Sequence, residues 1–560
     1  MTVADRGKRG MLEVRRNGGG EPVWRDAPAV TWRGRARAAF SAVGRLFATR
    51  SGRGVLLSVL SVAVGACAFR IMCDNFMYRG IDFDESHFVW GGWCINKGLV
   101  PYRDFLEFKP PMLFLTHALA LKIYGYDHLR YRWLFMWFPM ASLVALQVAL
   151  LSRRIGRLAA LALVLGIIHL WVDRRYHDAG LSDSESIGLT YFLLGVACLI
   201  ARSRRPAWLR SAGGALLLAS ALSKEPFLPI AGLTWVGCFL LDRREGTVRA
   251  DALEYLRHTA LGAGTLAFAL GLYLVPTGAL ASYLRTMLAY SKLHHDPARS
   301  YCVALGRFHP TTPLRDLLKQ LAQAQREFLN LGQLGYLLPF VAALLIFVRR
   351  QTALLLVAAV AVFAVALYSV TVGNCQWLHY YNLAMAGLFF ALVLALETTR
   401  RRLRTSWLWI PVGVACLAGV VWPLGPRLRD EWKSVGKRQP GDAYREPVRG
   451  VLAIIAQRTT PTDRIFTTGM PALYVQSDRI SAVRESAITD EALGMYPGDS
   501  DEERLQGLRQ QLERHMPKVV VLDPAYGPQR KERHNRVLLM PFLTEHAYTQ
   551  VAPLIWLRPY

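Results

Sequence analysis

The stretch that decides the fold, Ile81–Pro111, reads "IDFDESHFVWGGWCINKGLVPYRDFLEFKPP". It follows an apolar run, "GVLLSVLSVAVGACAFRIM" (Gly54–Met72), which is long enough to cross a bilayer core of about 30 Å. The stretch places Asp84 and Glu85 close to that run and then adds a Pro-Tyr-Arg-Asp turn and Lys-Pro-Pro. A segment so rich in aromatic and ionisable residues is more than a linker between two membrane spans.

The whole chain has the composition of a membrane protein. Its 560 residues are 52% hydrophobic and only 19% charged, and the uncharged stretches recur at about the length of a bilayer span. The sequence therefore predicts a polytopic α-helical membrane protein of about eleven transmembrane helices, with the N-terminus inside and the C-terminus outside. The expected spans are 54–72, 130–151, 157–173, 187–201, 211–224, 227–241, 258–276, 334–348, 352–372, 382–398 and 407–424.

Basic residues support this orientation. The net charge is +26, and residues 1–53 alone hold twelve Lys and Arg against four Asp and Glu. Further basic clusters fall on every second connection between spans, which the positive-inside rule assigns to the cytoplasm. Nucleic-acid binding is the weaker interpretation, and no nucleic-acid partner is expected, because no stacking aromatics interleave these clusters as a single-strand groove would need. The clusters are Arg153–Arg157, Arg202–Pro206, Asp242–Arg249, Arg349–Arg350 and Arg400–Arg404.

The domain organisation follows from these assignments. Residues 1–53 are expected to be a basic, disordered cytoplasmic arm without a cleaved signal peptide, and residues 54–424 a transmembrane domain. Its outer loops are 73–129, with surface helices at about 85–98 and at Pro111–Gly125, and 277–333. Alternating helix and strand signals predict a small α/β extracytoplasmic domain over residues 425–560. Its strand signals are Arg464–Gly469, Lys518–Pro524 and Gln550–Leu557, and its helix signals are Pro447–Thr459 and Asp501–His515.

The eight cysteines are spread singly, without a CxxC pair, so no zinc or redox motif is evident. Four of them are expected outside the cytoplasm, where a disulfide is chemically allowed but cannot be assigned from sequence. These are Cys73, Cys94, Cys302 and Cys375.

The first outer loop resembles that of a known enzyme family. The order "DE", Gly, "PYRDF", "KPP" and "ALALKIYG" looks like the GT-C fold glycosyltransferases that use polyprenyl-phosphate sugars, which include protein O-mannosyltransferases and lipid A aminoarabinose transferases. The resemblance implies a GT-C-like catalytic domain with an outward-facing site. It covers the membrane region well and residues 425–560 only loosely. The motif is more specific for the fold than for the substrate.

The acids of this loop suit the chemistry that the resemblance implies. A sugar on a lipid phosphate has a good leaving group, so the enzyme needs a carboxylate to deprotonate the acceptor and cations to stabilise the departing phosphate. We expect Asp84 to be the base and Glu85 the adjacent helper. The alternative is that both are loop acids that cap a helix.

A second outer loop, "RRYHDAGLSDSESIG" (Arg174–Gly188), places Asp183 and Glu185 before the next span. In the family, acids of this loop approach the same cavity, so we expect them to bind substrate or a divalent metal. A helix N-cap with a first-turn acid is an equally good interpretation. His177 and Asp178 are weaker candidates for such a metal site. No cofactor is otherwise expected.

The turn "SALSKEPFLP" (Ser220–Pro229) places Lys224 at the outer end of two short apolar runs. A lysine often occurs at the corresponding turn of the family and suits a phosphate clamp. The alternative is that Lys224 extends its ammonium group to the membrane surface or pairs with Glu225.

The segment "NCQWLHYYNLAM" (Asn374–Met385) opens a span from outside. Its His379 and Tyr380 match a His-Tyr-Tyr-like sequence that the family shows near the donor phosphate. An interfacial aromatic belt is the alternative. Arg103 and Lys109, in the first outer loop, are further candidates for the phosphate.

The sequence thus predicts a membrane glycosyltransferase that moves a hexosyl or pentosyl group from a polyprenyl-phosphate donor to a lipid, polysaccharide or protein acceptor at the outer face, with inversion. A bacterial inner membrane and a role in the cell envelope are expected. Two alternatives stay open. One is a transporter or flippase, which charged residues among many spans would also suit. The other is a non-catalytic member of the fold.

Overall fold

The structure is a computed structural model, and it divides into two compact units, Met1–Val64 and Gly65–Tyr560. The description below concerns the second unit. The described residues are 65–74, 76–77, 83–125, 130–153, 157–172, 181–201, 207–242, 248–295, 350–371, 380–402, 442–486, 501–522 and 538–559, with a few short pieces between 414 and 435.

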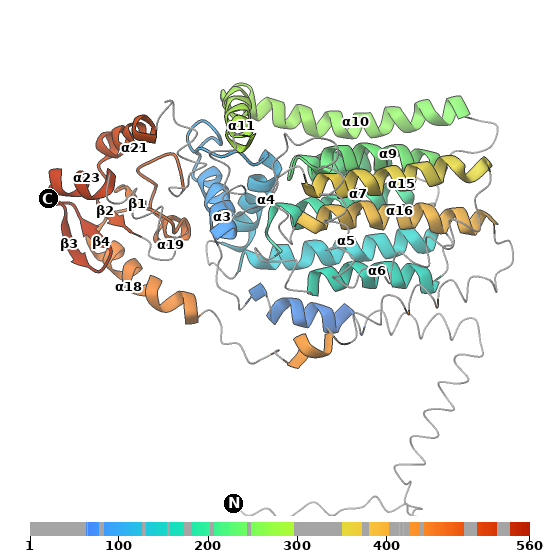
Figure 1. The fold of residues 1–560 in the computed structure, drawn as a ribbon, viewed down its shortest axis with the longest axis horizontal. Helices are drawn as coiled ribbons and strands as arrows, with labels where there is room; N and C mark the ends of the chain where they lie inside the picture. Colours follow the sequence, from blue (N-terminus) through green and yellow to red (C-terminus); the bar gives the residue numbers. More distant parts are fainter. Residues whose placement is uncertain are drawn as a thin grey trace, which may run out of the picture. The chain divides into compact units, whose positions relative to one another are not determined.

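Apolar helices run side by side through the larger part of this unit (Figure 1). Helix α8 packs against both α7 and α10, while α9 and α16 pack against α15, and α5 joins α7 to α6. Their bounds are α5 Arg132–Ser152, α6 Arg157–Val172, α7 Ser184–Ile200, α8 Ala207–Ala221, α9 Phe227–Asp242, α10 Val248–Leu274, α15 Arg350–Thr371 and α16 Tyr381–Arg402.

Length and composition identify spans among the described helices. Two stretches, Arg132–Ser152 and Ala353–Val370, are long and apolar enough to cross a bilayer. A third candidate is α10 with α11 (Ala279–His295), which meet at a bend of 98°. Helices α7, α9 and α16 are apolar but shorter. The chain is therefore a helical membrane protein.

The total of eleven spans stays a prediction. The expected span 334–348 lies outside the described residues, and so does most of 407–424. The expected span 258–276 corresponds to α10, which begins ten residues earlier at Val248.

The first outer loop contains the two helices that the sequence predicts, α3 (Phe83–Asn96) and α4 (Pro111–Tyr124). Proline at the first position of α4 starts a helix without losing a hydrogen bond. A Cβ atom on Gly91 would lie 2.4 Å from the Phe114 ring, and one on Gly92 only 2.6 Å from the Ala118 nitrogen. The glycine pair therefore allows α3 and α4 to touch, and the two helices frame the connection 97–110.

Residues 442–557 contain a four-stranded sheet in the order β1-β2-β4-β3. Strand β1 (Ile465–Thr467) is parallel to β2 (Val519–Val521), and β4 (Ile555–Leu557) is antiparallel to β2 and to β3 (Thr549–Ala552). The expectation of one strand over Gln550–Leu557 was wrong. Pro553 cannot donate to a ladder, so the segment forms a hairpin of β3 and β4 instead.

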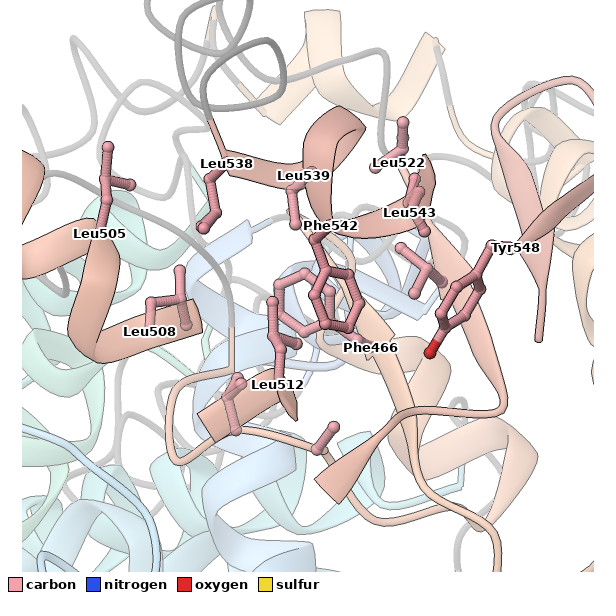
Figure 2. Close-up of a cluster of buried hydrophobic side chains, with 13 residues drawn as sticks. Phe466, Leu505, Leu508, Leu512, Leu522, Leu538, Leu539, Phe542, Leu543 and Tyr548 are labelled. Atoms are coloured by element: carbon pink, nitrogen blue, oxygen red, sulfur yellow. The ribbon is translucent and has the colours of Figure 1, made fainter. Parts of the chain in front are cut away.

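Helices α18 (Asp442–Arg458), α19 (Ala472–Ser477), α21 (Asp501–His515) and α23 (Met540–Glu545) accompany this sheet. Leucines 505, 508 and 512 recur at helical spacing on α21 and pack with Phe466, Phe542 and Tyr548 in one apolar core (Figure 2). We call residues 442–557 the C-terminal region; its status as a separate extracytoplasmic domain stays a prediction.

Candidate functional site

A tight turn between α8 and α9 holds Lys224. The Lys224 N–H donates to Ser220 O (3.2 Å), and its carbonyl accepts from the Phe227 N–H (3.0 Å), so the backbone reverses within a few residues. The side chain is only 7% exposed. Its Nζ lies 2.7 Å from Glu185 Oε1 and 4.6 Å from the centre of the Tyr380 ring. Lys224, Glu185 and Tyr380 were each predicted from a different segment of the sequence, and the structure brings them together. Tyr380 directly precedes α16.

The acids at the start of α7 have different tasks. Asp183 is the N-cap of α7, and its carboxylate accepts from the Ser186 N–H, as the helix-cap alternative expects. Glu185 lies in the first turn, where Ser184 Oγ donates to its Oε2 (2.7 Å) and Lys224 pairs with its Oε1. Glu185 therefore belongs to the lysine site, whereas Asp183 shapes the helix that carries it.

Lys109 shares this electrostatic environment. Burial opposes the charge on Lys109 and by itself would lower its pKa. The pKa is nevertheless raised above its ordinary value, because Tyr380 and Glu185 lie close by. Glu225 and Asp84 act in the same direction with smaller effects. Lys109 is thus a permanent cation at neutral pH, and it remains partly exposed.

Lys224 is subject to the same balance. Burial would lower its pKa, but the Glu185 carboxylate raises it, and the pKa ends above its ordinary value. Lys109 is close enough to lower the pKa of Lys224, as a second cation must. We call Lys109, Lys224, Glu185, Glu225 and Tyr380 the lysine cluster.

Asp84 lies in the first turn of α3 and is exposed. It raises the pKa of Lys109. Two ammonium groups close together can bind a phosphate group, and an exposed carboxylate beside them can accept a proton. Asp84 is thus near enough to Lys109 to act on its pKa, and its role as the base stays a prediction.

Glu85 lacks the accessibility that a catalytic helper needs. It is 1% exposed and pairs with Arg132, whose Nε donates to Oε1 (2.7 Å) and whose Nη2 donates to Oε2 (2.5 Å). The Tyr131 hydroxyl also donates to Oε1. Arg132 Nη1 donates to Phe76 O (2.6 Å). These contacts fasten α3 to α5, which favours a structural role for Glu85.

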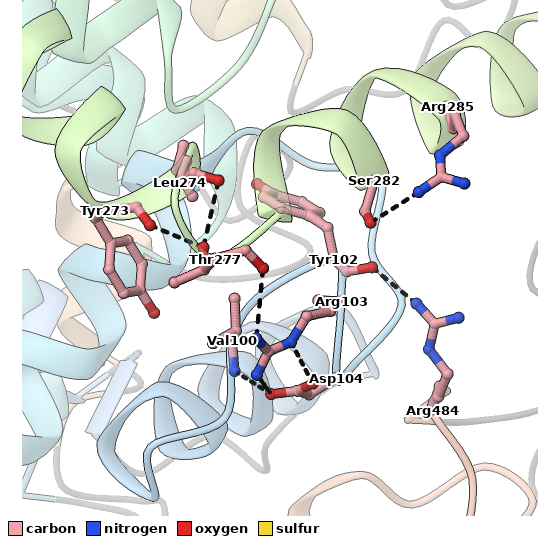
Figure 3. Close-up of polar contacts among 10 residues, drawn as sticks. All are labelled: Val100, Tyr102, Arg103, Asp104, Tyr273, Leu274, Thr277, Ser282, Arg285 and Arg484. Atoms are coloured by element: carbon pink, nitrogen blue, oxygen red, sulfur yellow. Dashed lines mark hydrogen bonds and ion pairs between the residues drawn. The ribbon is translucent and has the colours of Figure 1, made fainter.

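Arg103 lies at the elbow between α10 and α11 (Figure 3). Its Nε donates to Asp104 Oδ1 (2.8 Å), and Nη1 reaches Thr277 O at 3.4 Å. The side chain is half exposed. These contacts do not favour its predicted role as a phosphate ligand.

Several predicted groups fall on residues that the structure does not describe. They are His177, Asp178 and His379, together with Cys302 and Cys375. Cys73 and Cys94 are described and form no disulfide with each other.

A divalent metal finds no ready site in the described part of the chain, where no group of three or more His, Cys, Asp and Glu side chains could hold one. Glu185, a predicted ligand, is paired with Lys224. Asp183 caps its helix. Metal dependence stays a prediction, and the proposal below includes no step through a metal.

Sequence reasoning missed a second polar group beside the cluster. His87 bonds through Nε2 to the Glu107 carboxylate and through Nδ1 to Ser486 Oγ. Glu107 immediately precedes the "FKPP" segment, so its place beside the motif could have marked it as a candidate site residue. Nothing in the sequence linked Ser486, almost four hundred residues later, to His87.

Comparisons with known proteins give structural similarity only. No protein-family model matches the chain, and no curated protein does. ArnT from Cupriavidus metallidurans in the apo state is similar, with 12% identity, coverage of 90% of this chain and 98% of that chain, and a TM-score of 0.41. The same protein bound to undecaprenyl phosphate gives a TM-score of 0.39, with 12% identity and coverage of 89% and 97%.

A further similar structure is the archaeal oligosaccharyltransferase AglB from Archaeoglobus fulgidus, solved with an inhibitory peptide and a dolichol-phosphate. It is 11% identical and covers 83% of this chain and 69% of that chain, with a TM-score of 0.41.

Proposed function

We propose that this chain is a membrane glycosyltransferase that takes one sugar from a polyprenyl-phosphate donor and transfers it to an acceptor hydroxyl at the outer face of the membrane. One observation carries the proposal. Lys224 lies 2.7 Å from Glu185 and 4.6 Å from the centre of the Tyr380 ring, and the same two residues raise the pKa of Lys109, which is far from Lys224 in the sequence. We place the enzyme in a bacterial inner membrane, with this site facing away from the cytoplasm.

The reaction needs one displacement. Asp84 accepts the proton of the acceptor hydroxyl, whose oxygen attacks the anomeric carbon of the donor sugar. The bond between that carbon and the phosphate oxygen breaks, and its electron pair stays on the phosphate. A single displacement inverts the anomeric configuration.

The lysines stabilise the leaving group. Charge grows on the phosphate as the glycosidic bond breaks, and ammonium groups held in a buried site stabilise it more than they would in water. Glu185 and Tyr380 hold Lys224 in position. Lys109 is partly exposed, so we expect the phosphate to reach it.

The test is sugar transfer by the purified full-length chain in lipid nanodiscs. Undecaprenyl phosphate carrying radiolabelled mannose, glucose or 4-amino-arabinose would be supplied with envelope lipids, polysaccharide or protein as acceptors. We expect one donor to give labelled acceptor and an equal amount of free undecaprenyl phosphate, with inverted product configuration. Label that stays on every donor would contradict the proposal.

A parallel measurement addresses the alternative from another class. The same donors would be offered to sealed vesicles that contain the protein. Movement of intact donor across the bilayer without cleavage would identify a flippase and overturn the proposal.

A further inference from the structure

The backbone of Lys109 is fixed by two neighbouring side chains. Its N–H donates to Glu107 Oε1 (3.2 Å), which also accepts from the Phe108 N–H at 2.8 Å. Its carbonyl accepts from the Tyr102 hydroxyl at 2.7 Å. Because both ends of the Lys109 peptide are held, Glu107 and Tyr102 determine the direction in which the lysine side chain leaves the loop.

Tyr102 has an unusual conformation. Its φ of +64° lies in the left-handed region, which is unfavourable for a residue with a Cβ and persists where the surroundings impose it. The side chain is fully buried, and its ring centre lies 4.7 Å from that of Tyr283 on α11. The backbone of this turn is therefore held by contacts from outside the loop.

Arg484 supplies two of those contacts. Its Nη2 donates to the Tyr102 carbonyl (2.8 Å), as Figure 3 shows, and its own carbonyl accepts from the Leu106 N–H (2.8 Å). Arg484 thus holds the segment on both sides of Asp104. The residue comes from the C-terminal region, not from the membrane helices.

Ser486 is linked through His87 to Glu107, the second side chain that holds the Lys109 backbone. Its hydroxyl bonds with His87 Nδ1, and His87 Nε2 bonds with the Glu107 carboxylate. Glu107 is 2% exposed and Ser486 is 1% exposed, while the His87 side chain between them is 19% exposed. A chain of hydrogen bonds therefore runs from Ser486 through His87 and Glu107 to the N–H of Lys109.

The C-terminal region is well placed to hold these two residues. The Ala482 N–H donates to the carbonyl of Ile465 in β1 (2.9 Å), and the Arg484 N–H donates to Gln511 Oε1 on α21 (3.0 Å). The segment is therefore tied to the sheet and to a helix. Both routes to Lys109 begin within three residues of each other on this segment.

We propose that Arg484 and Ser486 are positioning residues for Lys109, so that docking of the C-terminal region sets the affinity of the site for the donor phosphate. The inference deepens the proposed function and rests on it. The C-terminal region then acts on the donor through the lysine, in addition to any role toward the acceptor.

The experiment measures undecaprenyl phosphate binding to the full-length protein in nanodiscs. We expect Ser486→Ala and Arg484→Ala each to raise the dissociation constant by roughly tenfold, as the loss of one strong hydrogen bond would. Ser486→Thr keeps the hydroxyl and should restore affinity. Hydrogen exchange of the peptide covering residues 106–112 should become faster in both alanine variants.

The matched control is Asp478→Asn. Asp478 joins the same two parts of the molecule through an ion pair with Lys97 (2.7 Å) and a hydrogen bond from Trp93 Nε1 (3.3 Å). Among the described residues, neither contact involves Tyr102, Glu107 or Lys109. We expect its dissociation constant to stay within about twofold of the parent protein, since an exposed ion pair contributes little.

A double-variant test separates positioning from general stability. In a Lys109→Gln background, Ser486→Ala should no longer weaken binding, because the group that it positions is gone. An equal loss in both backgrounds would overturn the inference, as would a lowered melting temperature with unchanged affinity.

The outcomes also distinguish the two proposals. Coupling between Ser486 and Lys109 in phosphate binding, without sugar transfer by the parent protein, would overturn the proposed function and keep the positioning. Sugar transfer without coupling between Ser486 and Lys109 would support the proposed function and overturn the positioning role.

Discussion

Two buried ion pairs lie beside the first outer loop, and they differ in what they leave accessible. Glu85 and Arg132 satisfy each other: both carboxylate oxygens accept from the guanidinium, and both side chains are at most 2% exposed. Lys224 and Glu185 are almost as deeply buried, but their neighbour Lys109 is partly exposed. We call Glu85–Arg132 the closed pair, because its side chains are buried together. We call Lys224–Glu185 the open pair, because its neighbour Lys109 is partly exposed.

This difference divides adjacent residues in the sequence. Asp84 and Glu85 both lie in the first turn of α3, yet one side chain is exposed and the other is buried. Neighbours on a helix are separated by about 100° of rotation, so they face different surroundings. A buried pair with all its hydrogen bonds serves the fold, and an exposed acid that acts on Lys109 is available for chemistry.

The largest expected effect comes from exchanging these acids for amides. Asp84→Asn should lower transfer by about 10²- to 10⁴-fold, the usual contribution of a general base, and change stability by less than about 0.5 kcal/mol. Glu85→Gln should instead destabilise the protein by about 3–5 kcal/mol, because it leaves the Arg132 charge buried without its counter-charge. Activity assays and thermal unfolding in detergent measure the two effects.

The same pair of variants can contradict the comparison. If Glu85→Gln folds normally and loses transfer, Glu85 acts in chemistry and the closed pair has been misread. If Asp84→Asn retains normal transfer, the proton is accepted elsewhere.

The next effect concerns the open pair. Lys224→Met should lower kcat/KM by about 10²- to 10³-fold, as loss of one preorganised charge at a developing anion does. The single variant also leaves the buried Glu185 without its ion-pair partner, so stability should fall. The double variant Lys224→Met/Glu185→Leu removes both charges and should recover stability without recovering transfer.

Recovery of transfer in that double variant would show that Lys224 serves only to neutralise Glu185. Unfolding and kcat/KM, measured on the same preparations, separate the two possibilities.

The helices of the membrane region could be predicted because their signal is local. Uncharged stretches fix α5, α6, α7, α9, α15 and α16 to within a few residues, and Pro111 marks the start of α4. The candidates Lys109, Lys224 and Tyr380 came mainly from the resemblance of their segments to a known family, and their role in one site stays a prediction.

The remaining features depend on contacts between distant segments. Nothing local separates Asp84 from Glu85; the partner Arg132 makes the difference, and it lies 47 residues away. Arg484 and Ser486 have no motif of their own. The hairpin of β3 and β4 was missed despite a local signal, Pro553, because its flanking residues are all compatible with one strand.

A smaller effect concerns pH and the bond that joins the C-terminal region to the loop. Burial lowers the pKa of His87, but Glu107 raises it and the net pKa lies above 6.5; Asp84 raises it further, and Lys109 opposes the rise. Burial raises the pKa of Glu107, yet His87 and two backbone N–H groups bring it below 4.5.

These directions define a window. The stabilisation from His87 is complete below its unfolded pKa and is lost as pH rises through its folded pKa. The stabilisation from Glu107 is present above its unfolded pKa and is lost as pH falls through its folded pKa. We expect undecaprenyl phosphate binding to weaken above neutral pH and His87→Gln to remove that dependence. An unchanged pH profile in this variant would exclude the His87 bond as the cause.

The smallest expected effect separates two cations of the same loop. Arg103→Ala should change the KM for the donor by less than about fivefold, because its partners are the neighbouring Asp104 and the elbow carbonyl of Thr277 and the side chain is half exposed. Lys109→Met should raise KM by more than about tenfold, since that ammonium lies in the cluster. Equal losses in the two variants would mean that position in the turn, and not membership of the lysine cluster, decides which cation meets the phosphate.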